Sequence, residues 1–308
     1  MPNLLKNFFS LGSVQVSGYL LTLVTMPYLI KTIGIEEFGV IVFSQTLVSY
    51  FIILIDYGFS ITATKEISEN RKNKGRINEI VSTVISIKIA IFTLGFLLYL
   101  LVLSIISPEE ERLLIYIVTY FMGLSNVFFP VYYFQGVEKM HYTAIFNILP
   151  KVVVLCSVFV FVKSPADTLV VAIITSLGFA ISGVTSLVYS IHLGVRYVKP
   201  SLQQCLLSVK DARSVFVGML SSNISSNSIV LFLGIFTSSS IVGTYSAVEK
   251  FVKPVSFFSN TLLQVIYPRM VDMKKNNLNY MSFCLKLSVV YLILLTLALL
   301  VYYFALNY

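Results

Sequence analysis

Nine stretches of 20 to 27 mostly apolar residues follow one another along the chain and are joined by short polar links. A helix needs about 20 apolar residues to cross the hydrocarbon core of a bilayer. Every backbone polar group in that core must be hydrogen-bonded within the protein, so only helices and closed barrels span it. We therefore predict an all-α polytopic membrane protein with nine transmembrane helices. Their approximate bounds are Phe8–Ile30, Phe38–Ser60, Val81–Ile106, Leu113–Phe134, Thr143–Val162, Thr168–Leu193, Ser214–Phe236, Ile241–Tyr267 and Phe283–Leu306.

The composition supports this class and argues against others. Charged residues make up only 12% of the chain, whereas about 25% is typical of soluble domains. The net charge of +8 is spread over the links, which does not indicate a nucleic-acid partner. Three distant cysteines and two isolated histidines give no metal-ligand spacing, and the chain has no glycine-rich phosphate loop and no nucleophile–base set. We expect no metal, no cofactor, no catalytic residues and no enzymatic activity.

The basic residues of the links predict the orientation. With a cytoplasmic N-terminus, 14 lysines and arginines fall on the inner links and 3 on the outer links, namely Lys31, Arg112 and Lys163. An excess of Lys and Arg on the cytoplasmic side is the usual pattern of membrane proteins. We therefore place the N-terminus inside and the C-terminus outside.

Seven charged side chains lie inside the apolar stretches. They are Asp56, Lys88, Lys151, Glu249, Lys250, Lys253 and Lys286. A charge at the bilayer centre costs about 2.5–3.5 kcal/mol on insertion scales, so such residues usually face the protein interior or a water-filled cavity. Because five of the seven are lysines, we expect a cavity that receives an anion.

The lysines differ in how deeply they lie. Lys88 is about seven residues inside the third helix, and its ammonium group either lines the cavity or reaches back to the interface. Lys151 lies deeper, directly after Pro150, which is expected to kink the helix. Lys286 lies one turn inside the ninth helix. We expect its ammonium group to reach back to the interface and not to line the cavity.

Each acidic residue has two candidate roles. Glu249 and Lys253 are four residues apart, so they can pair on their own helix instead of lining a cavity. Lys250 points to another face, and Pro254 is expected to bend the helix there, as in transporter binding sites. Asp56 either orients the basic link 65–76 at the interface or carries a coupling proton or ion.

Polar uncharged residues extend this pattern. Asn223 and Asn227 share one face of the seventh helix. The eighth helix carries a stripe on one face, formed by Glu249, Lys253, Ser256, Asn260 and Gln264. These side chains line the cavity or hydrogen-bond neighbouring helices.

An internal repeat indicates the domain organisation. A shift of 204 residues aligns Gly39 with Gly243, Gln45 with Glu249, Ser49 with Lys253 and Asp56 with Asn260. A shift that pairs the first helix with the seventh implies parallel six-helix units about an axis along the membrane normal. We predict a six-helix N-terminal lobe (1–193), a basic cytoplasmic linker (194–213) and an incomplete three-helix C-terminal lobe (214–308).

Five short segments, in order, resemble the Wzx-type polysaccharide flippases of the multidrug and oligosaccharide exporter (MATE-like) superfamily. These segments are Tyr28–Gly39, Asp56–Phe59, Phe134–Lys139, Gly243–Lys250 and Tyr267–Arg269. Members of that family usually have twelve or more helices, whereas this chain offers nine.

The resemblance implies two lobes around a central cationic cavity in the bacterial inner membrane. It implies the transport of undecaprenyl-diphosphate-linked oligosaccharide units for O-antigen or another surface polysaccharide. In that case Lys88, Lys151, Lys250 and Lys253 would attract the diphosphate, and Asp56 or Glu249 would couple an ion. Membrane lipids, a polysaccharide polymerase and a chain-length regulator are the further partners that it implies.

Three other functions stay open. A multidrug or cation exporter of the same fold would need buried carboxylates, which lysines outnumber here. A flippase for lipid-linked peptidoglycan precursors would use the same attraction of an anion. A membrane glycosyltransferase or polysaccharide polymerase could use the outer acids Glu36, Glu37 and 109–111 in acid–base chemistry.

Overall fold

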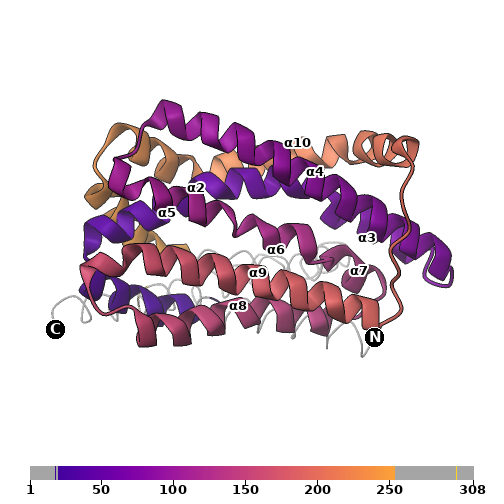
Figure 1. Cartoon of the computed structure of the whole chain (residues 1–308), viewed down its shortest axis with the longest axis horizontal. Coiled ribbons are helices and arrows are strands. Elements are labelled where there is room, and N and C mark those ends of the chain that lie inside the picture. Colours follow the sequence, from indigo (N-terminus) through magenta and orange to yellow (C-terminus); the bar gives the residue numbers. More distant parts are fainter. Residues whose placement is uncertain (1–17, 19, 254–295, 297–308) are drawn as a thin grey trace, which may run out of the picture. The chain divides into compact units, whose positions relative to one another are not determined.

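The computed structural model describes Gly18, residues 20–253 and Thr296. The chain divides into two compact units, Met1–Phe251 and Val252–Tyr308, and the packing described below belongs to the first. Within the described part, every regular element is a helix. The helix Leu20–Ile33 comes first, and a helix over residues 239–253 comes last in this part. Between them lie α2 (Ile35–Asp56), α3 (Phe59–Glu69), α4 (Lys74–Ile106), α5 (Glu110–Tyr120), α6 (Gly123–Phe128), α7 (Val131–Gly136), α8 (Met140–Phe161), η1 (Pro165–Asp167), α9 (Thr168–His192) and α10 (Leu202–Phe236) (Figure 1).

Six segments of the described chain are long and apolar enough to cross a membrane. They are Ile35–Glu69, Lys74–Ile106, Glu110–Gly136, Met140–Phe161, Pro165–His192 and Leu202–Phe236. They confirm the second to seventh predicted helices and indicate a multi-pass membrane protein. The first and eighth predicted helices are described in part, and of the ninth only Thr296 is described. The count of nine therefore stays a prediction.

The second predicted helix is broken where we expected it to continue. α2 ends at Asp56, and α3 starts at Phe59. Tyr57 and Gly58 between them have positive φ angles of 49° and 84°, and such angles are uncommon for residues other than glycine. The Tyr57 ring stacks on Phe216 of α10 at a centroid distance of 4.6 Å, so packing against α10 holds the break.

Part of the predicted linker is helical. Residues 202–213 form the first three turns of α10, which starts at a capping box between Ser201 and Gln204. Each of these two side chains binds the backbone N–H of the other residue, which satisfies donors that a helix start leaves open. With 35 residues, α10 is about 52 Å long, so it exceeds the roughly 30 Å hydrocarbon core.

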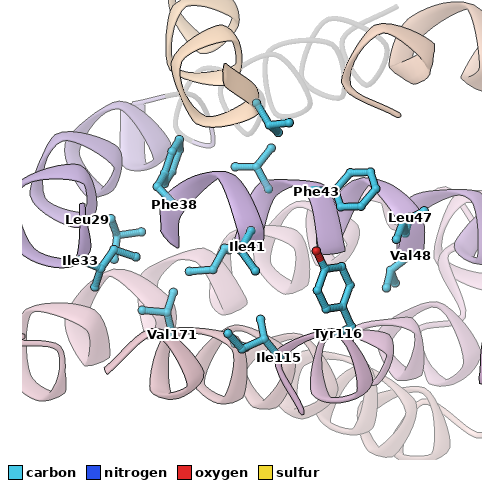
Figure 2. Close-up of a cluster of buried hydrophobic side chains, with 14 of the residues drawn as sticks. Leu29, Ile33, Phe38, Ile41, Phe43, Leu47, Val48, Ile115, Tyr116 and Val171 are labelled. Carbon is cyan, nitrogen blue, oxygen red and sulfur yellow. The ribbon is translucent and has the colours of Figure 1, made fainter. Parts of the chain in front are cut away.

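α2 is the central element of the first unit and packs against α4, α5, α6, α9 and α10. Buried side chains point from it in several directions, as expected for a helix that is apolar on all sides. Figure 2 shows Ile41, Phe43 and Leu47 of α2 together with Ile115 of α5 and Val171 of α9. This core fixes the position of α2 relative to its neighbours.

The two glycines that the 204-residue shift aligns meet in the structure. A Cβ atom on Gly39 would collide with the carbonyl oxygen of Ser239, and one on Gly243 with the carbonyl oxygen of Ile35. Ile35 and Ser239 are themselves 204 residues apart. The glycine of each segment therefore packs against the equivalent carbonyl group of the other segment. Two surfaces related by a two-fold axis contact each other in this reciprocal way. The division into lobes stays a prediction.

Candidate functional site

A cavity of about 210 Å³ lies among the helix Leu20–Ile33, α2, α8, α9 and the helix 239–253. Its polar lining consists of two lysines, one glutamine and three threonines. These residues are Lys151, Lys250, Gln45, Thr22, Thr25 and Thr175. Two of the four predicted cavity lysines therefore line one cavity, although 99 residues separate them in the sequence.

Pro150 interrupts the backbone hydrogen bonding of α8 directly before Lys151. Pro150 lacks an N–H, so the carbonyl of Phe146 one turn earlier loses its helical donor. The Ser182 hydroxyl of α9 donates to this carbonyl instead. A Cβ atom on Gly178 of α9 would lie 3.3 Å from the Pro150 carbonyl oxygen, so the two helices are close at this point. α9 thus supports the segment of α8 that carries Lys151.

The two ammonium groups lie in different surroundings. A Cβ atom built on Gly18 would collide with Nζ of Lys151, so the Lys151 ammonium lies against the backbone of the first helix. Nζ of Lys250 lies 4.7 Å from the centroid of the Phe38 ring, within the range of a cation–π interaction. Both lysines are held against other elements at the cavity.

The charge in the lining is positive. The Thr22, Thr25 and Thr175 hydroxyls donate to carbonyl oxygens of their own helices, at 2.9, 2.7 and 2.7 Å. Among the described residues that line the cavity, none is Asp or Glu, and Lys151 and Lys250 give this described lining two positive charges. Positive charge favours an anion.

Lys88 and Asp56 form a separate buried ion pair. Nζ of Lys88 lies 2.8 Å from Oδ1 of Asp56, 3.1 Å from Oδ1 of Asn126 and 3.3 Å from the Asn126 carbonyl oxygen. These three acceptors match the three hydrogens of an ammonium group. Oδ2 of Asp56 accepts the Ser60 hydroxyl at 2.7 Å. Lys88 is only 2% exposed.

This placement differs from what the sequence led us to expect. Neither Lys88 nor Asp56 belongs to the cavity lining, and the Asp56 carboxylate binds Lys88 and Ser60 instead of the basic link 65–76. The pattern within one helix does not predict this pairing, because Asp56 and Lys88 lie on different helices. The available signal was one negative and one positive charge near the same end of two consecutive predicted helices.

Of the other predicted residues, Asn223, Asn227 and Glu249 do not line the cavity of Lys151 and Lys250. Asn223 and Asn227 are partly buried on α10, and the Asn223 Oδ1 atom has no hydrogen-bond partner among the described residues. Glu249 is partly buried on the helix 239–253. Lys253 belongs to the second compact unit. Asn260, Ser256, Gln264 and Lys286 lie outside the described residues.

The outer acids converge on one arginine. Arg112 Nη2 lies 2.8 Å from carboxylate oxygens of both Glu36 and Glu37, and Nη1 lies 3.2 Å from Oε2 of Glu109. Three of the acids considered for acid–base chemistry are therefore engaged in ion pairs that join the start of α2 to the start of α5.

Comparison with known proteins identifies the family. The profile of the family described as "Polysaccharide biosynthesis protein" matches residues 4–274. The chain belongs to this polysaccharide biosynthesis family. The resemblance to polysaccharide flippases drawn from the sequence is thereby confirmed.

Two relatives in this polysaccharide biosynthesis family carry the name "Putative O-antigen transporter". The protein of Escherichia coli (strain K12) is 31% identical over 269 residues, which are 87% of this chain and 65% of the relative. The protein of Shigella dysenteriae is 24% identical over 273 residues, which are 86% of this chain and 67% of the relative. The chain thus spans about two thirds of the length of these relatives. No solved structure matches it.

Proposed function

We propose that this chain moves lipid-linked oligosaccharide units across the bacterial inner membrane for the synthesis of O-antigen or a related surface polysaccharide. The observation that carries the proposal is the cavity in which Lys151 and Lys250 meet without a carboxylate among its described lining residues. Membership of a polysaccharide biosynthesis family and relatives named as O-antigen transporters support it. The cargo would be undecaprenyl-diphosphate carrying the sugar units.

The size and charge of the cavity suit the diphosphate group. Pockets for drug-sized ligands have volumes of about 300–1,000 Å³, so a cavity of about 210 Å³ accommodates a diphosphate and not an entire oligosaccharide. Lysine binds phosphate as a compact point charge. In this proposal Lys151 and Lys250 hold the diphosphate, the lipid tail stays in the bilayer, and the sugars need a wider state of the cavity.

The remaining predictions form part of the same proposal. The topology has nine helices with the N-terminus inside, and it consists of a six-helix lobe (1–193), a linker (194–213) and a partial second lobe (214–308). Glu249 or Asp56 takes part in ion coupling. The buried ion pair of Lys88 supports a positioning role for this residue between α2 and α4. Polysaccharide polymerase and chain-length regulator are the protein partners.

Complementation tests the proposal. The chain is expressed in a bacterium that lacks its own O-antigen flippase and makes the matching repeat unit, and surface polysaccharide is measured. We expect display to be restored, and we expect Lys151→Ala and Lys250→Ala each to reduce it strongly while Lys151→Arg retains part of it. Lys210→Ala, which removes an exposed lysine of α10, is the matched control. Full display with both alanine variants would refute the cationic cavity.

The same assay separates the other functions. A polymerase or glycosyltransferase would change polymer length, and three of its five candidate acids, Glu36, Glu37 and Glu109, pair with Arg112. An exporter of cationic drugs would raise drug resistance without restoring display, and the described cavity lining offers no carboxylate for such a substrate. A peptidoglycan precursor flippase would rescue growth in cells depleted of that activity.

A further inference from the structure

A second cavity, of about 130 Å³, lies at the opposite end of α4 from the α4–α5 connection. The start of α4, the end of α7, the start of α8 and the chain between α9 and α10 line it. We call it the basic pocket. Its polar lining residues are Arg71, Lys74, Asn78 and Lys139.

Hydrogen bonds between different elements fix the walls of the basic pocket. Arg71 donates from Nε to the Gly136 carbonyl at 2.8 Å and from Nη2 to the Ser68 hydroxyl at 2.9 Å, which ties the chain after α3 to the end of α7. Oδ1 of Asn78 accepts the backbone N–H of Arg196 at 3.0 Å. This bond ties the α9–α10 connection to α4. The pocket is therefore a built feature and not a chance gap between loops.

The charge of the basic pocket is positive. Arg71 forms an ion pair with Glu138 at 2.8 Å. Among the described residues, neither Lys74 nor Lys139 forms an ion pair. These lysines stand at the N-terminal ends of α4 and α8, where the helix dipoles add positive potential. Two cations that no carboxylate neutralises thus face one small cavity.

The position of the basic pocket suits a ligand at the membrane surface. Tyr197 lies two residues after Val195, which lines the pocket. Its hydroxyl shares a hydrogen bond of 3.1 Å with the Ser86 hydroxyl of α4, and most of the residue is exposed. Tyrosine is enriched at the level of the lipid headgroups. The lining also includes apolar residues such as Ile77 and Leu193. By the distribution of Lys and Arg, this end of the helices faces the cytoplasm.

We propose that the basic pocket binds a phosphate group, supplied by the headgroup of an anionic lipid of the inner leaflet. A volume of about 130 Å³ exceeds the roughly 30 Å³ of one water and is below that of a drug-sized site, which fits a phosphate. Basic pockets between transmembrane helices on the cytoplasmic side are known to bind such headgroups. Lys74 and Lys139 supply the charge, and the Asn78 amide nitrogen supplies a neutral donor. This site is distinct from the cavity of Lys151 and Lys250.

Ligand-dependent stability tests the proposal, because a ligand that binds only the folded state raises the melting temperature. The purified full chain in neutral detergent is titrated with short-chain phosphatidylglycerol, with phosphatidylcholine and with inorganic phosphate. We expect phosphatidylglycerol to raise the melting temperature and phosphatidylcholine to have little effect. Lys74→Gln and Lys139→Gln should each weaken the apparent affinity about fivefold, and the double variant should abolish the shift.

The control has the same change in net charge. Lys65→Gln/Lys72→Gln removes two exposed lysines, one on α3 and one between α3 and α4, that do not line the basic pocket. This variant should respond to phosphatidylglycerol as the unaltered chain does. A shift of equal size with inorganic phosphate that the pocket variant abolishes would support the phosphate site and assign it to a soluble anion. An undiminished shift in the pocket variant, or no shift with either anion, would overturn the proposal.

Discussion

At the scale of single residues, Lys88 shows how a charge is tolerated inside this protein. Its three ammonium hydrogens meet Asp56 and two oxygens of Asn126. A buried ion pair adds little net stability when it is compared with apolar side chains of similar volume, but the loss of one partner leaves an uncompensated charge. Its main consequence is therefore that α2 and α4 are held in one register.

We expect Asp56→Ala and Lys88→Met each to destabilise the protein by about 3–5 kcal/mol, because each leaves one buried charge without its partner. The double variant should lose much less than the sum of the two. Melting temperatures of the purified variants in one detergent measure this coupling, with Lys210→Met as an exposed control. Additive losses would show that the two residues act independently.

A glycine offers a second test at this scale. Gly18→Ala places a methyl group where the Lys151 ammonium lies, and the flexible lysine end can move away at little cost. We expect reduced surface polysaccharide with normal protein levels, and no further loss when Gly18→Ala is added to Lys151→Ala. Gly218→Ala is the control, because a Cβ at Gly218 meets no atom within 4 Å. Normal display with Gly18→Ala would show that transport does not depend on the position of the Lys151 ammonium group.

At the scale of elements, α8 depends on α9 for a hydrogen bond that its own proline removes. Ser182→Ala leaves the Phe146 carbonyl without this donor, and we expect a loss of about 1–3 kcal/mol. On a Pro150→Ala background the restored backbone N–H can bind the same carbonyl, so the same change should cost clearly less. Melting temperatures of the unaltered chain, the two single variants and the double variant decide this. Equal costs on both backgrounds would show that Ser182 stabilises α8 in another way.

The elements also show what the sequence could and could not predict. Apolar stretches located six spans, because length and hydropathy alone decide that property. The break at Tyr57 was missed, since packing against Phe216 of α10 holds it and no local pattern encodes that contact. The early start of α10 was predictable from the Ser201–Gln204 capping box.

The candidate site, too, was only partly predictable from the sequence. The cationic character of the cavity could be predicted, because a lysine in an apolar stretch is costly unless it faces the protein interior or water. The sequence could not predict which lysines share a cavity, because only the packing of distant helices brings Lys151 and Lys250 to the same cavity. The sequence led us to expect Lys88 either in the cavity or at the interface, and it is instead neutralised by Asp56.

At the scale of the whole chain, the contact of Gly39 with Gly243 joins two segments that are far apart in the sequence. The atoms that a Cβ would meet are backbone carbonyl oxygens, which cannot move aside as a flexible side chain can. We expect Gly39→Val and Gly243→Val to reduce display to a similar extent, because the contact is reciprocal. Gly218→Val is the control. Tolerance of either glycine variant would show that the helices can separate here without loss of function.

The charge of the cavity has a consequence for the energetics of the proposed cycle. Its described lining carries two positive charges, and moving one elementary charge through the membrane potential involves about 2.3 kcal/mol per 100 mV. A bound diphosphate offsets these two charges, so loading weakens the force that the membrane voltage exerts on the described lining. Without the diphosphate, a potential that is negative inside draws these two charges toward the cytoplasm. Membrane voltage would then return the empty carrier to the side where its cargo is made.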